Sequence, residues 1–483
     1  MSISSALDAA NSGLRATSLR AEIVATNVAN ASTPGYVRRS VILSETIVGG
    51  ETQGVRVDGI GQARNEALTA QRMLSSSELA QADVLASAWQ TLSARIGDTA
   101  DGTGIFSEFE RLETSLATAV TTPESGTSAI AVLDAAQGII NEFQDLSALS
   151  ANLRAEADLG IAEGVNFVNT SLKQIEDLNT RISGIDRTTE QAAAIRDERQ
   201  RLIDGIAEYM PVTVVNRNAG KVDIFTPQGV ALLAGTAREL EFSPANTFGP
   251  EHTIASGTLS PLTVQGIELT PGSGDYGALP SGMFAGLFTL RDTDIPAFTS
   301  QLDALAGELV DRVSAAGIDP TVTAGDPGLF YDPDAAATID GLAARFALNP
   351  AVDPNQGGSS WRLRDGLGAT VQGPPGDSTI LSNLYDALTE VRAVDSNGVQ
   401  GAFSLTSMAA QLTSLTGQTR IQMETVQSSV QAQHRIILNA EQTESGVDVD
   451  QQMQELLLVE QAYAANARVI QAAQEMIRQL MEI

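Results

Sequence analysis

The chain has 483 residues, 43% of them hydrophobic, which is enough for roughly three domains with packed cores. Its 59 acidic and 29 basic residues give a net charge of -30, which disfavours binding to nucleic acid or to anionic membrane surfaces. The absence of cysteine excludes disulfides, thiolate metal sites and thiol nucleophiles. No run of about twenty apolar residues is present, and the N-terminus resembles no cleaved signal peptide, so neither membrane insertion nor Sec-type secretion is expected.

The first stretch predicted to be helical covers residues 3–30. Apolar and small residues recur there at steps of four and three, the spacing of a coiled-coil seam. These residues are Ile3, Leu7, Ala10, Leu14, Thr17, Ala21, Val24 and Val28. Because burial of small residues stabilises a helix only weakly, this helix is expected to need a partner. Pro34 and Gly35 then predict a turn, after which Tyr36 begins an extended run.

The next part of the chain is predicted to be mostly helical. Gly49, Gly50 and Gly54 first interrupt an extended stretch at residues 37–57, which predicts a hairpin or an irregular connector. Long apolar stripes with few aromatic residues follow, which is typical of a bundle or a rod. The helices are expected at residues 62–96, 105–120, 123–156 and 160–207, with an interruption at 184–189.

At residue 209 the apolar pattern changes to period two. Short runs separated by Gly and Pro predict a β domain at residues 209–280, inserted into the helical chain and projecting from it. Helical pattern returns from about residue 282 and is clearest at residues 294–316. Residues 317–375 are rich in Gly, Pro and Asp and predict an irregular excursion with little core material. Further helices are expected at residues 378–394 and 401–444.

The last helix carries a second seam. Its spacing of three and four residues matches that of the first helix, and it includes one polar Asn of the kind that fixes register. Its members are Leu456, Val459, Tyr463, Asn466, Ile470, Ala473, Ile477 and Leu480. Two matching seams at opposite ends of the chain predict that the ends pair with each other.

We therefore predict a mainly α fold with an inserted β domain and a coiled coil of the two chain ends. The helical bundle or rod is expected to be built from both halves of the chain. The predicted domains are a terminal coiled coil (1–45 and 446–483), a helical bundle or rod (46–208, 281–320 and 376–445), a β domain (209–280) and the irregular excursion (321–375).

Three patterns are typical of chemical sites, and each favours a structural interpretation here. Residues 272–277 match G-x-G-x-x-G, but no helix opens directly after them, which favours a flexible loop over a dinucleotide site. Residues 98–102 are acidic, but the closing Glu of an EF-hand loop is missing. His252 and His434 are the only histidines and lie in different kinds of predicted structure. No enzyme activity, cofactor or metal site is predicted.

Two terminal motifs carry a family resemblance. Residues 27–36, Asn-Val-Ala-Asn-Ala-Ser-Thr-Pro-Gly-Tyr, follow an amphipathic helix and resemble the N-terminal signature of the bacterial flagellar axial proteins, which include rod, hook and hook-associated proteins. Residues 445–450, 455–457 and 461–470 resemble the C-terminal helix of that family. Residues 287–292 and 347–350 are similar to the hook-associated members at the hook–filament junction.

The resemblance implies a structural component of the flagellum that assembles into a tubular layer connecting hook to filament. It implies that Asn27, Asn30, Pro34, Gly35 and Tyr36, with the two seams, form subunit contacts. The implied partners are copies of the chain itself, the hook protein, the second junction protein and a flagellar export chaperone. The implied location is extracellular, reached by flagellar type III export without a cleaved signal peptide.

Two alternatives stay open at this point. The first is another axial protein, such as the hook protein or the second junction protein. The second is a secreted adhesin or binding module that is displayed through residues 209–280.

Overall fold

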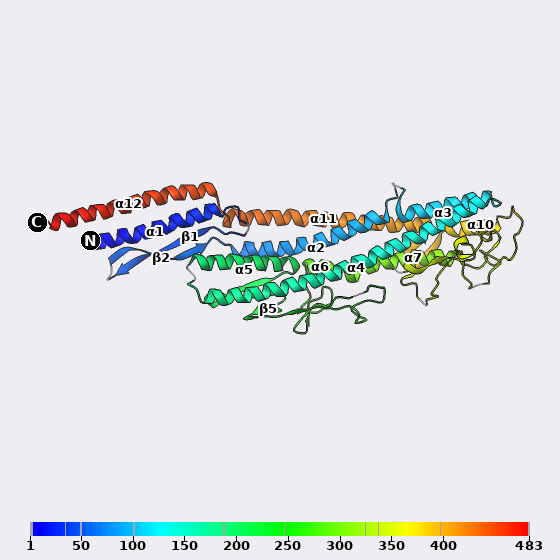
Figure 1. The fold of residues 1–483 in the computed structure, drawn as a ribbon, viewed down its shortest axis with the longest axis horizontal. Helices are drawn as coiled ribbons and strands as arrows, with labels where there is room; N and C mark the ends of the chain where they lie inside the picture. Colours follow the sequence, from blue (N-terminus) through cyan, green and yellow to red (C-terminus); the bar gives the residue numbers. More distant parts are fainter. Residues whose placement is uncertain are drawn as a thin grey trace.

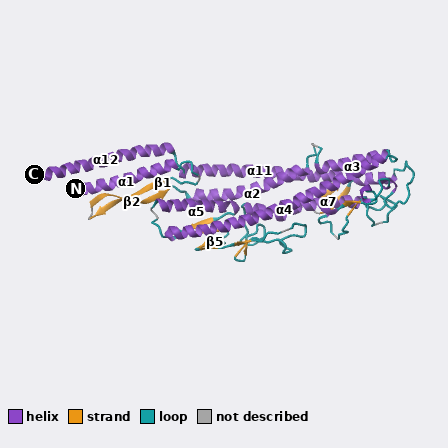
Figure 2. Cartoon of the chain, viewed as in Figure 1, coloured by secondary structure: helices purple, strands orange, loops and turns teal. Residues whose placement is uncertain are grey.

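The computed structural model describes residues 3–33, 35–48, 51–99, 102–186, 189–245, 247–323, 325–336, 338–396 and 398–481. The molecule is elongated, and long helices run along its length (Figure 1). Both ends of the chain lie together at one tip, and most loops gather along one side and at the other tip (Figure 2).

Ten helices of at least seven residues form the frame among the described residues. They are α1 (Ile3–Ala29), α2 (Glu66–Ile96), α3 (Gly104–Thr121), α4 (Gly126–Ser183), α5 (Glu190–Tyr209), α6 (Met283–Thr289), α7 (Ile295–Val313), α10 (Thr379–Thr389), α11 (Leu405–Ser445) and α12 (Val449–Met481). Shorter turns are η1 (Asn218–Gly220), the π-helical η2 (Leu290–Asp294), α8 (Leu342–Arg345), η3 (Pro354–Gln356) and α9 (Arg362–Asp365). Polar N-caps start several helices, as where the Asn65 side chain accepts the N–H of Ala67 at the start of α2.

In the part of the chain that the structure describes, the strands form five small antiparallel sheets. The hairpin of β1 (Arg39–Val48) and β2 (Glu51–Gln62) follows α1. Four strands make one sheet and three make the next: β3 (Thr213–Asn216), β4 (Val222–Phe225), β5 (Ala231–Ala234) and β6 (Thr236–Ala237), then β7 (Leu240–Glu241), β8 (Thr263–Val264) and β9 (Ile267–Glu268). Two further pairs are β10 (Phe330–Tyr331) with β11 (Ala347–Leu348), and β12 (Arg392–Ser396) with β13 (Val399–Phe403). The predicted fold class, mainly α with small β parts, is confirmed.

The expected break after residue 156 is wrong, because α4 continues unbroken through it. The glycines in this stretch serve packing rather than helix termination. A Cβ atom on Gly164 would lie 2.6 Å from the ring of Phe284 and 2.7 Å from the ring of Tyr209. A glycine here therefore allows two aromatic rings to reach the helix backbone.

The irregular excursion contributes to the core, so the expectation of little core material there is wrong. Phe330 and Phe346 are fully buried, and the ring of Phe346 lies 5.1 Å from that of Phe143 on α4. These side chains belong to the large apolar core that α2, α3, α4, α7, α10 and α11 share. Phe330 and Phe346 therefore join the excursion to the shared core.

The helix expected at residues 378–394 ends earlier, at Thr389, and the hairpin β12–β13 follows.

The two β-sheets between α5 and α6 pack on the helices. Their apolar core includes Val168 and Leu172 of α4 and Ile206 of α5, so it crosses the boundary predicted at residue 208. At the π-helical turn η2, the fully buried Arg291 lies 2.5 Å from Asp158 of α4. This ion pair fixes the turn, and with it the start of α7, to α4.

Among the described residues, no helix combines the length and the apolar character that crossing a membrane requires.

A half-buried histidine predicts a pH dependence of stability. His434 Nδ1 of α11 lies 2.9 Å from Ser75 Oγ of α2. Burial, and then the positive charge of Arg72, lower the pKa of His434 below its usual 6.5. Protonation therefore favours the unfolded chain, and the contribution of His434, full above about pH 6.5, is lost as the pH falls below that value. We expect the free energy of unfolding to decrease from pH 7 to pH 5.5, and the substitution His434→Gln to reduce that slope. Equal slopes in chemical denaturation of both proteins would contradict this.

Candidate functional site

The two chain ends pair as antiparallel helices at one tip of the molecule (Figure 1). Arg20 of α1 lies 2.8 Å from the carboxylate of Glu455 of α12. Gly13 contacts Asn466, which lies further along α12. Since the residue numbers rise along α1 while they fall along α12, the helices run in opposite directions. The predicted pairing of the chain ends is confirmed, and we call α1, the hairpin β1–β2 and α12 together the terminal layer.

The predicted seam residues are buried to different degrees. Val24 and Val459 are buried; Ile3, Leu7, Leu14, Val28, Leu456 and Ile470 are half-buried; Tyr463 and Ile477 are exposed. Pro34 and the side chain of Leu480 lie outside the described part of the chain. The line of α12 that faces α1 passes through Gln452, Val459, Asn466 and Ala473, at intervals of seven residues. The side of α12 that contacts α1 therefore differs slightly from the predicted seam, and Tyr463 lies outside it.

Asn27 is the polar centre of the terminal layer. Its side chain is buried and makes four hydrogen bonds. The Nδ2 group donates to the carbonyl of Arg39 at 2.9 Å and to Gln452 Oε1 at 2.8 Å. The Oδ1 atom accepts the Tyr36 hydroxyl at 2.8 Å and the Arg39 N–H at 3.0 Å. One amide thus joins α1, the start of the hairpin and α12, and every polar atom of that amide is satisfied.

Arg39 connects this centre to the helical body. Its guanidinium donates to Asp197 at 3.0 Å and to Glu190 at 3.1 Å, both on α5, and it lies 4.9 Å from the ring centre of Tyr36. Burial raises the pKa of the Asp197 carboxyl, and the hydrogen bond from Arg39 opposes that rise. The N–H of Arg38 donates to the carbonyl of Ser445, where α11 ends. The terminal layer is therefore held to the body by directed polar contacts.

The other residues of the predicted motif have local roles. The Asn30 side chain donates to the carbonyl of Thr26, one turn earlier, and accepts from Thr33. Gly35 is exposed and has a φ of 76°, the left-handed conformation that favours glycine. Asn27 and Tyr36 are thus brought together, whereas Asn30 and Gly35 shape the turn. Their role in contacts between subunits stays a prediction.

Sequence reasoning missed Gln452, Arg39 and Asp197. Gln452 had a detectable signal, since it is a polar residue one heptad before Val459 in an apolar line. Arg39 and Asp197 lie 158 positions apart in the sequence. No local pattern indicates that they form an ion pair.

The hairpin contacts α1 on a different side from α12 (Figure 1). The N–H of Val55 donates to Ser12 Oγ at 3.1 Å. A Cβ atom on Gly54 would lie 2.3 Å from the same hydroxyl oxygen, and Gly54 has a φ of 113°. A glycine is therefore required where β2 approaches α1.

Close packing of α1 on α12 yields a stability prediction. A Cβ atom on Gly13 would lie 2.8 Å from the side-chain amide of Asn466. We expect Gly13→Leu to lower the protection of α1 amides against hydrogen exchange by about 1–3 kcal/mol, because the larger side chain forces the helices apart. The matched control is Gly417→Leu in α11, where nothing lies within 4 Å of an added Cβ atom. Equal effects of both changes on α1 would contradict the prediction.

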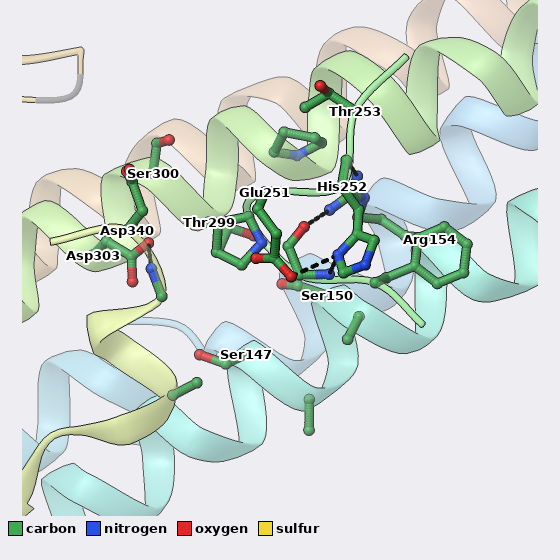
Figure 3. Close-up of a pocket in the computed structure, with 18 of the residues that line it drawn as sticks. Ser147, Ser150, Arg154, Glu251, His252, Thr253, Thr299, Ser300, Asp303 and Asp340 are labelled. Atoms are coloured by element: carbon green, nitrogen blue, oxygen red, sulfur yellow. Dashed lines mark hydrogen bonds and ion pairs between the residues drawn. The ribbon is translucent and has the colours of Figure 1, made fainter. Parts of the chain in front are cut away.

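A cavity of about 1160 Å³ lies in the helical body, between α4, α7 and the loop around His252 (Figure 3). Its polar groups already serve the fold. Arg154 donates to the carbonyls of Arg291, Gly249 and His252 at 2.9, 2.9 and 2.6 Å. Asp303 accepts the N–H groups of Gly341 and Ala343. These contacts attach the loops to the helices.

Comparison with known families decides the identity. A model described as the flagellar hook-associated protein FlgK helical domain matches residues 79–328, more than half of the chain. The chain belongs to the FlgK family of flagellar hook-associated proteins. The flagella basal body rod protein model matches residues 7–36, and the flagellar basal body rod FlgEFG protein C-terminal model matches residues 439–483. Together they cover most of α1 and all of α12, and the second also includes the end of α11.

Relatives along the whole chain agree with this family. Flagellar hook-associated protein 1 of Escherichia coli (strain K12) is 24% identical over 100% of both chains. The protein of the same name from Bacillus subtilis (strain 168) is 20% identical over 98% of this chain and 96% of its own. The solved flagellar hook junction protein FlgK of Burkholderia pseudomallei matches with a TM-score of 0.45 and 19% identity, over 55% of this chain and 46% of that one. The resemblance noted in the sequence is confirmed, and the family's function is structural, at the hook–filament junction.

Proposed function

We propose that this chain assembles through its terminal layer into a tubular layer that connects the flagellar hook to the filament. The observation that carries the proposal is the antiparallel pair of α1 and α12, which the buried Asn27 holds together and Arg39 fixes to the helical body. Such a pair presents both chain ends as one rigid unit at one tip of the molecule. Head-to-tail contacts between units of this kind generate rings or helical tubes.

The proposed partners are further copies of the chain, the hook protein on one side and the second junction protein on the other. Matches to rod-protein models at residues 7–36 and 439–483 support this, because neighbours in one axial structure then share the same kind of terminal layer. A flagellar export chaperone is proposed to bind the chain before assembly. The proposed location is the extracellular flagellum, reached by type III export without a cleaved signal peptide.

The direct test is electron microscopy of flagella from cells that lack this chain, with the culture medium assayed for flagellin. Hooks without filaments and flagellin lost to the medium are the expected result. Normal filaments on such cells would overturn the proposal.

Point variants in the seam test whether the terminal layer carries assembly. Leu14 and Ile470 are half-buried residues of the predicted seams. We expect Leu14→Glu or Ile470→Glu to abolish filament attachment, because a charge placed in the seam separates α1 from α12. The sheets at residues 213–268 should stay folded by circular dichroism. The exposed Arg15→Glu is the matched control on α1 and should retain filaments. Filaments on cells that carry both seam changes would contradict the prediction.

A further inference from the structure

The cavity of Figure 3 lies between facing sides of two helices, α4 and α7. On α4 the lining residues recur at steps of three and four and therefore share one side of the helix: Gln144, Ser147, Ala148, Ala151 and Arg154. On α7 the same spacing holds for Pro296, Thr299, Ser300 and Asp303. The cavity volume of about 1160 Å³ exceeds the range of about 300–1,000 Å³ that is typical of small-molecule sites, so a ligand of more than one ring fits.

The fold leaves several polar groups of this cavity unused. Ser147 Oγ is buried and has no hydrogen-bond partner among the described residues. Within the same described part of the chain, the side chains of Gln144 and Ser300 form no hydrogen bond. Arg154 has five N–H groups, and its bonds to three backbone carbonyls use three of them. Because a buried polar group without a partner costs free energy, these groups suit a ligand that both donates and accepts hydrogen bonds.

The cavity also borders the π-helical turn η2. Asp292 of this turn lines the cavity, and the carbonyl of Arg291 in the same turn accepts the Nε–H of Arg154 at 2.9 Å. Turns of this kind are rare, and they occur frequently at functional sites. The position of η2 is therefore a second, independent indication that the cavity is a binding site.

The charges of the lining disfavour ionic ligands. Four carboxylates and two guanidinium groups line the cavity, from Glu251, Asp292, Asp303, Asp340, Arg154 and Arg345. This excess of negative charge repels an anion. An organic cation finds no free buried carboxylate, because the oxygens of Asp292 accept from Arg291 and those of Asp303 accept from backbone N–H groups.

Two further classes of ligand fit the lining poorly. Among the residues that the structure describes, no group of three acidic or histidine side chains is arranged to hold a metal ion. A purely apolar ligand would displace water from the hydroxyls of Ser147 and Ser300 without replacing its hydrogen bonds, which is unfavourable. The class that fits is a neutral molecule rich in hydroxyl groups.

We infer that this cavity binds a neutral carbohydrate. The hydroxyl groups of a sugar ring donate and accept, which matches the unused side chains of Gln144, Ser147 and Ser300. The C–H faces of the ring pack on apolar groups, which the lining offers at Ala148 and Pro296. Such a site gives the chain a recognition function in addition to the assembly proposed above, and it does not rest on that assembly.

Binding of the purified full-length chain to an array of neutral and acidic glycans tests the inference. All buffers are free of glycerol, which carries the same hydroxyl chemistry. Isothermal titration calorimetry with glucose, galactose, mannose and N-acetylglucosamine then compares single sugars with the glycans that bind. Ala148→Phe fills the cavity from the exposed Ala148 of α4, and Ala131→Phe is the matched control at an exposed alanine of α4 outside the cavity.

The expected result is binding of neutral glycans by the unaltered chain and by Ala131→Phe, and at least tenfold weaker binding by Ala148→Phe. Equal affinity for single sugars and for glycans would support the inference with a free sugar as the ligand. Affinity for glycans alone would support it with a polymer-borne carbohydrate. Binding of acidic glycans only, equal binding by Ala148→Phe, or no binding by the unaltered chain would overturn the inference.

Ser147→Ala keeps the inference falsifiable if Ala148→Phe does not fold. We expect the affinity to fall about two- to tenfold, the value of one hydrogen bond. The free energy of unfolding should not decrease, because the Ser147 hydroxyl has no partner among the described residues of the unliganded chain. Unchanged affinity, or a loss of affinity that accompanies a loss of stability, would contradict a role of Ser147 in binding and overturn the inference.

Discussion

Replacing Asn27 with alanine is expected to lower the free energy of opening the terminal layer by at least about 3 kcal/mol. The change leaves the N–H and carbonyl of Arg39, the Tyr36 hydroxyl and the Gln452 amide without their partner. Each buried polar group left unpaired costs about 1–3 kcal/mol. Amide hydrogen exchange of α1 and of residues 38–40 measures the effect, because it reports opening of the layer separately from unfolding of the body.

Asn30→Ala is the matched control for this prediction. Asn30 belongs to the same motif, but its amide bonds only to Thr26 and Thr33 within its own turn. A loss below about 1 kcal/mol is expected there, since water can replace these partly exposed bonds. If the two alanine variants lose equal protection in α1, Asn27 is not the centre of the layer.

The second large effect is expected from Asp158→Ala in the helical body. Asp158 accepts from the buried guanidinium of Arg291 at 2.5 Å and from the N–H of Ala245 at 2.7 Å. Removing one partner of a buried ion pair costs about 3–5 kcal/mol. The lower end of that range is expected, because Asp292 also bonds to Arg291. Chemical denaturation followed by circular dichroism measures the loss.

Two comparisons isolate the role of burial. Glu239→Ala breaks the exposed pair with Lys173, whose atoms are 3.5 Å apart, and should cost below about 1 kcal/mol. The double variant Asp158→Leu with Arg291→Met should recover most of the stability lost in Asp158→Ala, because apolar residues of similar size often replace a buried pair without loss. A double variant as unstable as the single one would mean that the contacts to Ala245 and Asp292, rather than the charge pair, hold this region.

Sequence periodicity predicted the pairing of the chain ends because heptad spacing is a local signal that survives in α1 and α12. It also placed the long helices of the body, whereas the glycines after Tyr36 indicated a hairpin or an irregular connector. Periodicity gave wrong predictions where a residue contacts a partner that is far away in the sequence. The break expected after residue 156 is absent, and Gly164 in the continuous helix admits the rings of Phe284 and Tyr209. Phe346 looked isolated in a loop, yet it packs against Phe143, about two hundred residues earlier in the chain.

The same contrast between local sequence signals and long-range contacts applies to the candidate site. The motif at residues 27–36 indicated an important segment, but the different roles of Asn27 and Asn30 depend on which of them faces Gln452. The seam on α12 was predicted slightly out of phase, because Tyr463 is apolar in character yet 50% exposed. The prediction assumed one apolar face, whereas α12 has apolar side chains on several faces. The ion pair of Arg39 with Asp197 is visible only in the folded structure.

The continuous helix α4 has a mechanical consequence. Its 58 residues span about 87 Å at 1.5 Å per residue, without an interruption at which the rod can bend. Because α2 and α11 run antiparallel beside each other in the same body, several helices together resist twisting of one end of the rod. A torque that enters at the terminal layer is therefore transmitted along these helices towards the far tip.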